Sequence, residues 1–96
     1  MQFKSVKIPD TITNIGEYTF SDNDLTAIEM PVGIVSIGDR ALNNNNLRSI
    51  KIPDTVTSIG DYAFISNNLK SVKIPDGIFV DGFKFDSDVE FNIINY

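Results

Sequence analysis

Cysteine and histidine are both absent from the 96-residue chain. Without cysteine there is no disulfide framework and no thiolate nucleophile, and without either residue there is no Cys/His zinc site. A Ser-His-Asp or Cys-His catalytic unit cannot be assembled from the remaining residue types. These absences argue against an enzyme, so we expect no catalytic residues, no cofactor and no metal.

Long apolar runs and an excess of basic residues are also missing. The apolar runs are too short for a membrane-crossing helix, and residues 1–7 contain no signal-peptide core. Eight basic against thirteen acidic residues give a formal net charge of -5, which repels phosphate polymers. We therefore expect a cytoplasmic protein that contacts neither nucleic acid nor membrane, unless the chain is cut from a longer exported protein.

Prolines and glycines are few, but they recur at one fixed spacing. Each proline follows the previous one by 22 residues, and four of the six glycines keep the same step. The positions are Pro9, Pro31, Pro53 and Pro75, and Gly16, Gly38, Gly60 and Gly82. A constant period of this length predicts a solenoid of stacked coils, each too small to bury its own apolar side alone.

Apolar residues keep the same register as the prolines. We predict that each column of like residues forms one ladder of the core, running from coil to coil. One predicted ladder contains Val6, Ile28, Ile50, Val72 and Ile94. A further column, which is polar, consists of Asn23, Asn45 and Asn67. Their side-chain amides can satisfy the backbone groups of a turn.

The best-preserved unit, residues 47–68, predicts the local structure of a coil. A short strand ends at Pro53, which has no N–H for a further ladder bond. Residues 56–59 read as a second extended piece. Gly60 then suits a sharp turn at positive φ, and residues 61–64 suit one turn of α- or 3₁₀-helix.

The last unit departs from this pattern. Aspartates at 81 and 86 stand where the period would place Ile59 and Phe64 again. The strand pattern then returns from Phe91 onward. We predict that residues 81–96 form a C-terminal cap with a fifth strand, because terminal repeats of a solenoid need a polar outer side.

The unit LRSIKIPDTVTSIGDYAFISNN, residues 47–68, resembles the BspA-like leucine-rich repeat, with the pattern L-x-x-I-x-I-P-x-x-V-x-x-I-G-x-x-A-F. The resemblance implies a right-handed leucine-rich repeat solenoid forming a single domain over residues 1–96. A five-strand parallel sheet would line its concave face, with short extended or 3₁₀ segments on the convex side. The units are expected at about 3–24, 25–46, 47–68 and 69–80, followed by the cap at 81–96.

Basic residues gather at the strand positions that alternate with buried ones. Six of the eight fall there, with one acid among them. The predicted partner-binding surface consists of Lys4, Lys7, Glu29, Arg48, Lys51, Lys70 and Lys73. Such a surface fits an acidic face of another protein, although lysines also keep an exposed strand soluble. Acids crowd the cap instead, at Asp81, Asp86, Asp88 and Glu90.

Three functions are compatible with these features. The leading hypothesis is a non-catalytic protein–protein interaction module that binds through its strand face or the solenoid end. The alternative is a small acidic inhibitor of a nucleic-acid-handling enzyme, similar to an anti-CRISPR protein, which would bind through the acidic site of the cap. A second alternative is a structural fragment of a bacterial surface adhesin, because relatives of the repeat are often adhesins.

The N-terminal strand suggests a further partner. Residues 3–8 form a strand that no earlier strand covers, and an uncovered edge strand invites pairing. We therefore expect that a homodimer can form through this edge.

Overall fold

The computed structural model describes residues 5–78 and 83–94. In this part of the chain there are strands and turns but no helix. The strands are β1 (Ser5–Lys7), β2 (Asn14–Ile15), β3 (Ala27–Glu29), β4 (Ser36–Ile37), β5 (Ser49–Lys51), β6 (Ser58–Ile59), β7 (Ser71–Pro75) and β8 (Glu90–Ile94).

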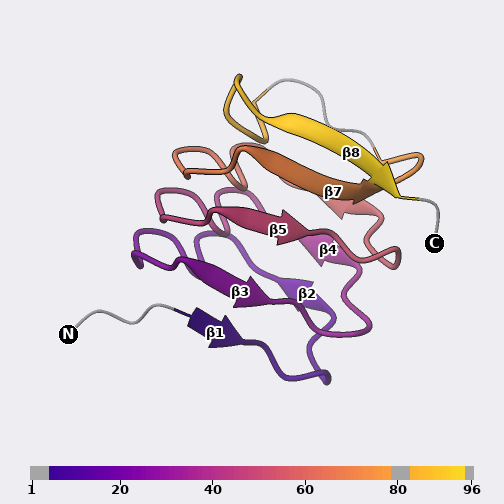
Figure 1. Ribbon diagram of the computed structural model, residues 1–96. Coiled ribbons are helices and arrows are strands. Elements are labelled where there is room, and N and C mark those ends of the chain that lie inside the picture. The colour runs from indigo at the N-terminus through magenta and orange to yellow at the C-terminus, as the bar shows by residue number, and fades with distance from the viewer. Residues whose placement is uncertain (1–4, 79–82, 95–96) are drawn as a thin grey trace.

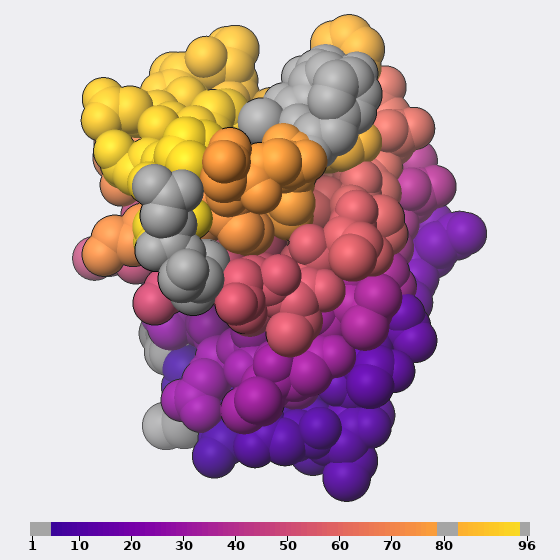
Figure 2. Space-filling view, turned by 90° about the vertical axis from the view of Figure 1, so that its right-hand side faces the viewer, coloured from indigo at the N-terminus to yellow at the C-terminus, as the bar shows by residue number. Residues whose placement is uncertain are grey.

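Successive coils stack in chain order, as the indigo-to-yellow bands of Figure 2 show. Strands β1, β3, β5, β7 and β8 lie side by side along one side of the stack, and the shorter β2 and β4 lie behind them (Figure 1). All strand pairs are parallel. The chain is therefore a parallel β-solenoid of about four turns, as the 22-residue period predicts.

The core consists of aliphatic ladders that run between the two layers of strands. Leu25 and Leu47 are fully buried, and Leu69 above them is 2% exposed. Strand register places Val6 opposite Ile28, which confirms the predicted ladder in the first two coils. Burying a side chain of this size stabilises the fold by about 1.5–3 kcal/mol, so the stacked columns supply the main driving force.

The strands on the long side do not form one sheet. Pairing divides them into β1–β3 and β5–β7–β8, while β2–β4–β6 make a third sheet. The predicted five-strand sheet is therefore not confirmed, although β3 and β5 are neighbours. Two surface hollows border the seam between these strands, and each is lined by Ile28 and Lys51.

The last coil is shorter than its predecessors, so the predicted place of Ile94 is wrong. Phe91, not Ile94, lies opposite Val72 and continues that ladder. Phe85 occupies the place predicted for Asp86, since its ring stacks on Phe64 with centroids 4.9 Å apart. Phe85 also meets Phe91 edge-on at 5.1 Å. Burial of these aromatic rings decides the register here, where the period of the sequence has already ended.

Glycine at position 60 is explained by a close approach of two coils and not by the predicted positive φ. A Cβ built on Gly60 would lie only 2.6 Å from the backbone carbon of Gly38 in the coil below. Gly38 has the same relation to the first coil, where its Cβ would lie 2.9 Å from the carbonyl oxygen of Ile15. Glycine is therefore needed at the places where one coil's backbone rests directly on the next.

The predicted helical turn after Gly60 is also wrong. Residues 61–64 form a non-helical turn in which Tyr62 has a φ of 61°. The equivalent residues Tyr18 and Arg40 have φ values of 59° and 54°. A left-handed residue interrupts the right-handed helical path, and it allows backbone N–H groups of the turn to reach carbonyl groups of the neighbouring coil. One such bond joins the Leu42 N–H to the Ala63 carbonyl at 2.9 Å.

The predicted role of the asparagine column is confirmed. The Asn45 side chain is 5% exposed, and its Oδ1 accepts hydrogen bonds from the N–H groups of Asn23 and Leu25. Its Nδ2 donates to the carbonyl of Phe20 at 2.8 Å. Asn67 repeats the arrangement one coil later, accepting from the Leu47 N–H. These amides satisfy the polar backbone of turns that are otherwise buried.

Candidate binding surface

The strand face is the surface formed by outward-pointing side chains of β1, β3, β5, β7 and β8. In one row across it, Lys7 lies opposite Glu29, and Lys51 lies opposite Lys73. Lys7 and Glu29 form an ion pair with 3.6 Å between Nζ and Oε2, and both side chains are 69% exposed. The row therefore contains one ion pair and one register pair of like charge.

The like-charged pair is costly in isolation. Parallel strands lie about 4.8 Å apart, and like charges directly opposite destabilise a sheet by an amount comparable to the ~0.2–1 kcal/mol of a favourable pair. Lys51 and Lys73 are both exposed, so water moderates the repulsion. The C-terminal half of the strand face nevertheless carries a concentrated positive charge that the N-terminal half does not.

A second row across the strand face carries hydroxyl groups. Ser49 lies opposite Ser71, and Ser71 lies opposite Glu90. Glu90 lies within the predicted cap, at the start of its strand. Because the last coil is short, Glu90 opens β8 opposite Ser71, and its side chain is exposed.

A hollow of about 290 Å³ lies on this part of the strand face. It spans three neighbouring strands, β3, β5 and β7. Its lining consists of Ala27, Ile28, Ser49, Ile50, Lys51, Ser71 and Lys73. The structure thus brings two of the predicted basic residues and two hydroxyl groups to the same depression.

The remaining predicted basic residues lie beside this hollow or outside the described range. Arg48 and Lys70 are exposed and directly precede β5 and β7, so they adjoin the same two strands. Lys4 lies outside the residues that the structure describes.

The residues of the predicted acidic site have different surroundings. Asp86 is half-buried, and its carboxylate accepts hydrogen bonds from the Ser66 and Asn67 N–H groups at 3.0 and 3.1 Å. It thereby takes over the structural task that asparagines perform in earlier coils. Asp88 is exposed, Glu90 belongs to the strand face, and Asp81 lies outside the described residues.

Sequence reasoning missed a column of aromatic and cationic side chains on the opposite side. The guanidinium of Arg40 lies 4.6 Å from the ring centroid of Tyr62 and donates a 3.3 Å hydrogen bond to the Tyr18 hydroxyl. Tyr62 in turn stacks on Phe83 with centroids 5.8 Å apart. The signal was available, since Tyr18, Arg40 and Tyr62 are spaced by 22 residues, but their differing chemistry concealed the column.

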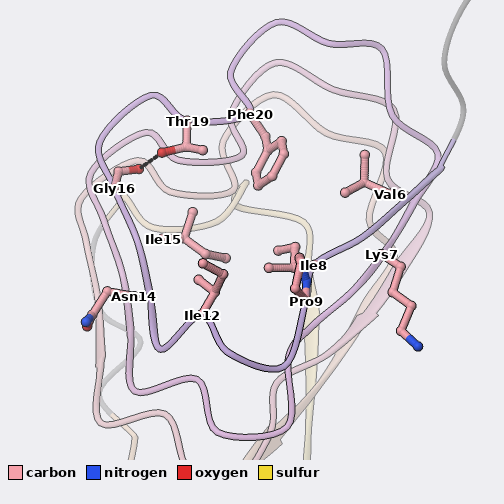
Figure 3. A pocket seen from close by; sticks show the side chains of 10 residues that line it. All are labelled: Val6, Lys7, Ile8, Pro9, Ile12, Asn14, Ile15, Gly16, Thr19 and Phe20. Carbon is pink, nitrogen blue, oxygen red and sulfur yellow. Dashed lines mark hydrogen bonds between the residues drawn. The ribbon is translucent and has the colours of Figure 1, made fainter.

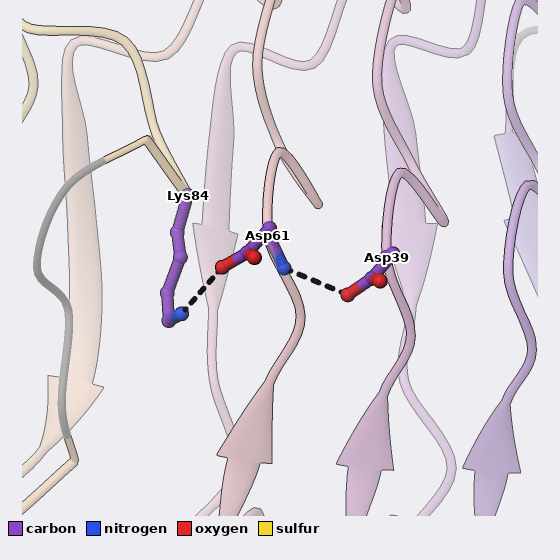
Figure 4. Close-up of polar contacts among 3 residues, drawn as sticks. All are labelled: Asp39, Asp61 and Lys84. Atoms are coloured by element: carbon purple, nitrogen blue, oxygen red, sulfur yellow. Dashed lines mark hydrogen bonds and ion pairs between the residues drawn. The ribbon is translucent and has the colours of Figure 1, made fainter.

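An acidic column runs beside these aromatic side chains. The Asp61 N–H donates to the Asp39 carboxylate at 2.9 Å, and Lys84 lies 3.5 Å from Asp61 (Figure 4). The contacts join three successive coils. Carboxylates here link one coil to the next, and they lie on the side of the molecule away from the lysine-rich strand face.

The N-terminal end of the solenoid contains an apolar hollow of about 300 Å³. Ile8, Ile12, Ile15 and Phe20 point into the interior of the first coil, whereas Lys7 points away from it (Figure 3). Ile12 is 38% exposed at this end. The described part of β1 has one strand neighbour, β3.

A comparison with protein families places the chain. The model of the BspA type leucine-rich repeat region, in six copies, matches residues 1–88. The chain therefore belongs to the family of BspA-type leucine-rich repeat proteins. No curated protein matches it, and no solved structure does.

Family membership favours one broad class of function. Repeats of this kind suggest a protein-interaction or adhesin-like module, and the family is typically non-enzymatic. Among residues 5–78 and 83–94, no three acidic side chains are grouped as a metal site would require. No helix in the same residues is long and apolar enough to cross a membrane.

Proposed function

We propose that the protein is a non-catalytic interaction module that binds an acidic segment of a partner protein through its strand face. The observation that supports this most is the register of Lys51 with Lys73. Two cations on adjacent strands give this part of the strand face a positive charge, which complements the charge of an acidic partner. Short rigid strands hold both side chains without the ordering cost that a flexible loop would add.

The pair formed by Lys7 and Glu29 has a different part in this proposal. Its charges already neutralise each other, so it contributes little attraction to an acidic partner. Glu29 instead repels a partner acid that approaches one coil too early. We expect Glu29→Gln to change which acidic partners are accepted more than it changes the affinity for the correct one.

Affinity capture with matched charge variants tests the proposal. The test variant is Lys51→Ala with Lys73→Ala, and the control is Arg40→Ala with Lys84→Ala, which removes the same charge from the opposite side. A captured protein is identified by mass spectrometry, and its affinity is then measured with purified components. We expect the test variant to lose at least about tenfold in affinity, the loss of one or two charged contacts. Equal loss in both variants would contradict binding through the strand face.

A homodimer through the N-terminal edge is a separate proposal about partners. It is supported by the edge of β1 that no strand among the described residues pairs with, and by the apolar hollow beside it, because both gain from cover by a second copy. Light scattering across a hundredfold range of concentration is the test. A dimer should dissociate on Val6→Lys, which places a charge beside the hollow, whereas a constant monomeric mass of the unaltered chain would refute it.

A further inference from the structure

The starting point is the exposure of core side chains at both ends of the stack. At the C-terminal end, Ile93 lies opposite Ile74 in β7, yet Ile93 is 58% exposed and Ile74 only 1%. At the N-terminal end, Ile12 is 38% exposed, whereas Ile34, the equivalent residue of the next coil, is fully buried. Each end therefore leaves in water an apolar side chain that a further coil would bury.

The terminal coils also have unpaired backbone edges. Among the described residues, β1 pairs with β3 alone, and β8 pairs with β7 alone. Elsewhere in the first two coils, the Val35 N–H donates to the Thr13 carbonyl at 2.7 Å, and the Gly38 N–H donates to the Ile15 carbonyl at 2.8 Å. The equivalent N–H groups of the first coil, those of Thr13 and Gly16, have no such carbonyl among the described residues. Unused donors along an edge are a template for another strand.

The two ends are complementary, because every seam inside the molecule already joins the same two surfaces. Where the first two coils meet, β1 and β3 pair in parallel, and β7 and β8 do the same where the last two meet. The free edge of β1 is equivalent to the edge of β3 that β1 covers. The free edge of β8 is equivalent to the edge of β7 that β8 covers. A second copy in the same orientation therefore repeats a contact that the fold already uses, whereas two β1 edges related by a two-fold axis would pair antiparallel.

The side chains at the two ends agree with this stacking. Phe83 stacks on Tyr62 and is nevertheless 67% exposed, while Tyr18 is exposed at the other end of the same column. A second copy would bring its Tyr18 next to Phe83, and offset or edge-on aromatic pairs are favourable. On the strand face, the rows place Ser5 of the second copy beside Glu90, and its Lys7 beside Asn92. No like charges meet in that register.

We propose that the C-terminal end of one copy, formed by Phe83 and β8, stacks on the N-terminal end of another, with β8 parallel to β1 and Ile93 at the apolar hollow of the first coil (Figure 3). The inference rests on the proposed cover of the N-terminal edge by a second copy, and it specifies which surface of that copy lies there. Because two different surfaces meet, each pair keeps one free end of each kind, and assembly continues beyond a dimer. The strand face stays exposed along the assembly, which would present several copies of it to a partner.

Two variants that each block one end test this contact. Ile93→Lys charges the C-terminal end and Ile12→Lys the N-terminal end, and both replace side chains that already reach water, so the ammonium groups can stay hydrated. By sedimentation velocity, we expect the unaltered chain to grow beyond a dimer as its concentration rises, and each variant alone to stay monomeric. An equimolar mixture should form a one-to-one pair, since each variant keeps the end that the other lacks.

The matched control for these variants is Val32→Lys. Val32 is 74% exposed on the side of the second coil, so this substitution adds the same charge away from both ends. We expect Val32→Lys to assemble as the unaltered chain does. Loss of assembly in this control would contradict a contact between the ends, because it would show that added charge alone disperses the copies.

Cysteine trapping tests the orientation of the copies and does not depend on the blocked variants. The chain contains no cysteine, and β3, β5 and β7 lie between β1 and β8 (Figure 1). Lys7→Cys with Asn92→Cys can therefore form disulfides only between copies. Oxidation should give a ladder of linked multimers on a non-reducing gel, whereas Lys7→Cys alone should give no linked dimer.

Several results would overturn the stacking. A monomeric mass of the unaltered chain at every concentration would refute both the stacking and the homodimer. A dimer that survives Ile93→Lys, is lost in Ile12→Lys and becomes linked through Lys7→Cys alone would leave the homodimer standing and remove only the stacking. Failure of the two blocked variants to pair on mixing, with thermal unfolding showing that both are folded, would also contradict it.

Discussion

The middle coils and the last coil bury the same kind of core by different means. In the middle coils, aliphatic ladders repeat every 22 residues, and buried asparagines such as Asn45 satisfy the turns. In the last coil, Phe91 replaces an aliphatic rung, Phe85 continues the column of the buried Phe64, and the carboxylate of Asp86 replaces the asparagine amide. What a coil must supply is therefore an apolar rung and an acceptor for the turn, and the spacing between them can change.

The largest expected effect is a loss of folding stability, and it distinguishes two aromatic residues of the last coil. Phe85 is 5% exposed and stacks on Phe64, whereas Phe83 is 67% exposed. Phe85→Ala should lower the free energy of unfolding by about 3–5 kcal/mol, the usual cost of removing a buried aromatic ring. Phe83→Ala should cost less than about 1 kcal/mol. Urea denaturation of both variants measures the difference, and similar losses would mean that Phe85 does not close the core.

A smaller effect tests the contact between backbones in the middle coils. Gly60→Ala inserts a Cβ against Gly38 and should destabilise by about 1–3 kcal/mol through overpacking. Gly33→Ala is the matched control, because no atom lies within 4 Å of its Cβ position. That variant should change stability by no more than about 1 kcal/mol. Thermal unfolding compares the two, and a neutral Gly60→Ala would disprove the close approach.

The asparagine column gives an effect no larger than that of Gly60→Ala. Asn45→Ala leaves the N–H groups of Asn23 and Leu25 without their acceptor, which should cost about 1–3 kcal/mol. Asn68→Ala removes one exposed bond to Asn46 and should cost at most about 0.5 kcal/mol. Asp86→Asn keeps one of the two acceptor oxygens, so it should be milder than Asn45→Ala, which removes the acceptor of both N–H groups. If Asp86→Asn proves the more damaging, the second acceptor oxygen and the charge of Asp86 contribute more than a single hydrogen bond.

The sequence predicts the repeated part of the fold well, because stacking requires one residue type at one spacing. The aliphatic ladders, the strand that ends near each proline and the asparagine column all follow from that requirement. Gly60 was misjudged because a turn and a close approach both select glycine, and only the neighbouring coil distinguishes them. The register of β8 could not be derived, since Phe85 and Phe91 compete with Ile94 for core positions once the period ends.

The candidate site could likewise be predicted from the sequence only where the 22-residue period holds. Lysines of the strand face were identified because β5 and β7 keep the period. The register of Glu90 with Ser71 could not be derived, because it depends on the shortened last coil. The aromatic column of Tyr18, Arg40 and Tyr62 shares one backbone conformation at positive φ. Its 22-residue spacing is visible in the sequence, but the differing chemistry of the three side chains conceals it.

The register of β8 decides whether Glu90 borders the lysine-rich half of the strand face, and a disulfide can measure it. The chain contains no cysteine, so each engineered pair gives one possible bond. Lys73→Cys with Asn92→Cys joins register partners, and parallel strands at about 4.8 Å allow a disulfide. Ser71→Cys with Ile93→Cys follows the 22-residue spacing instead. We predict that the first pair oxidises readily in the folded protein and the second does not, and the opposite result would contradict the account.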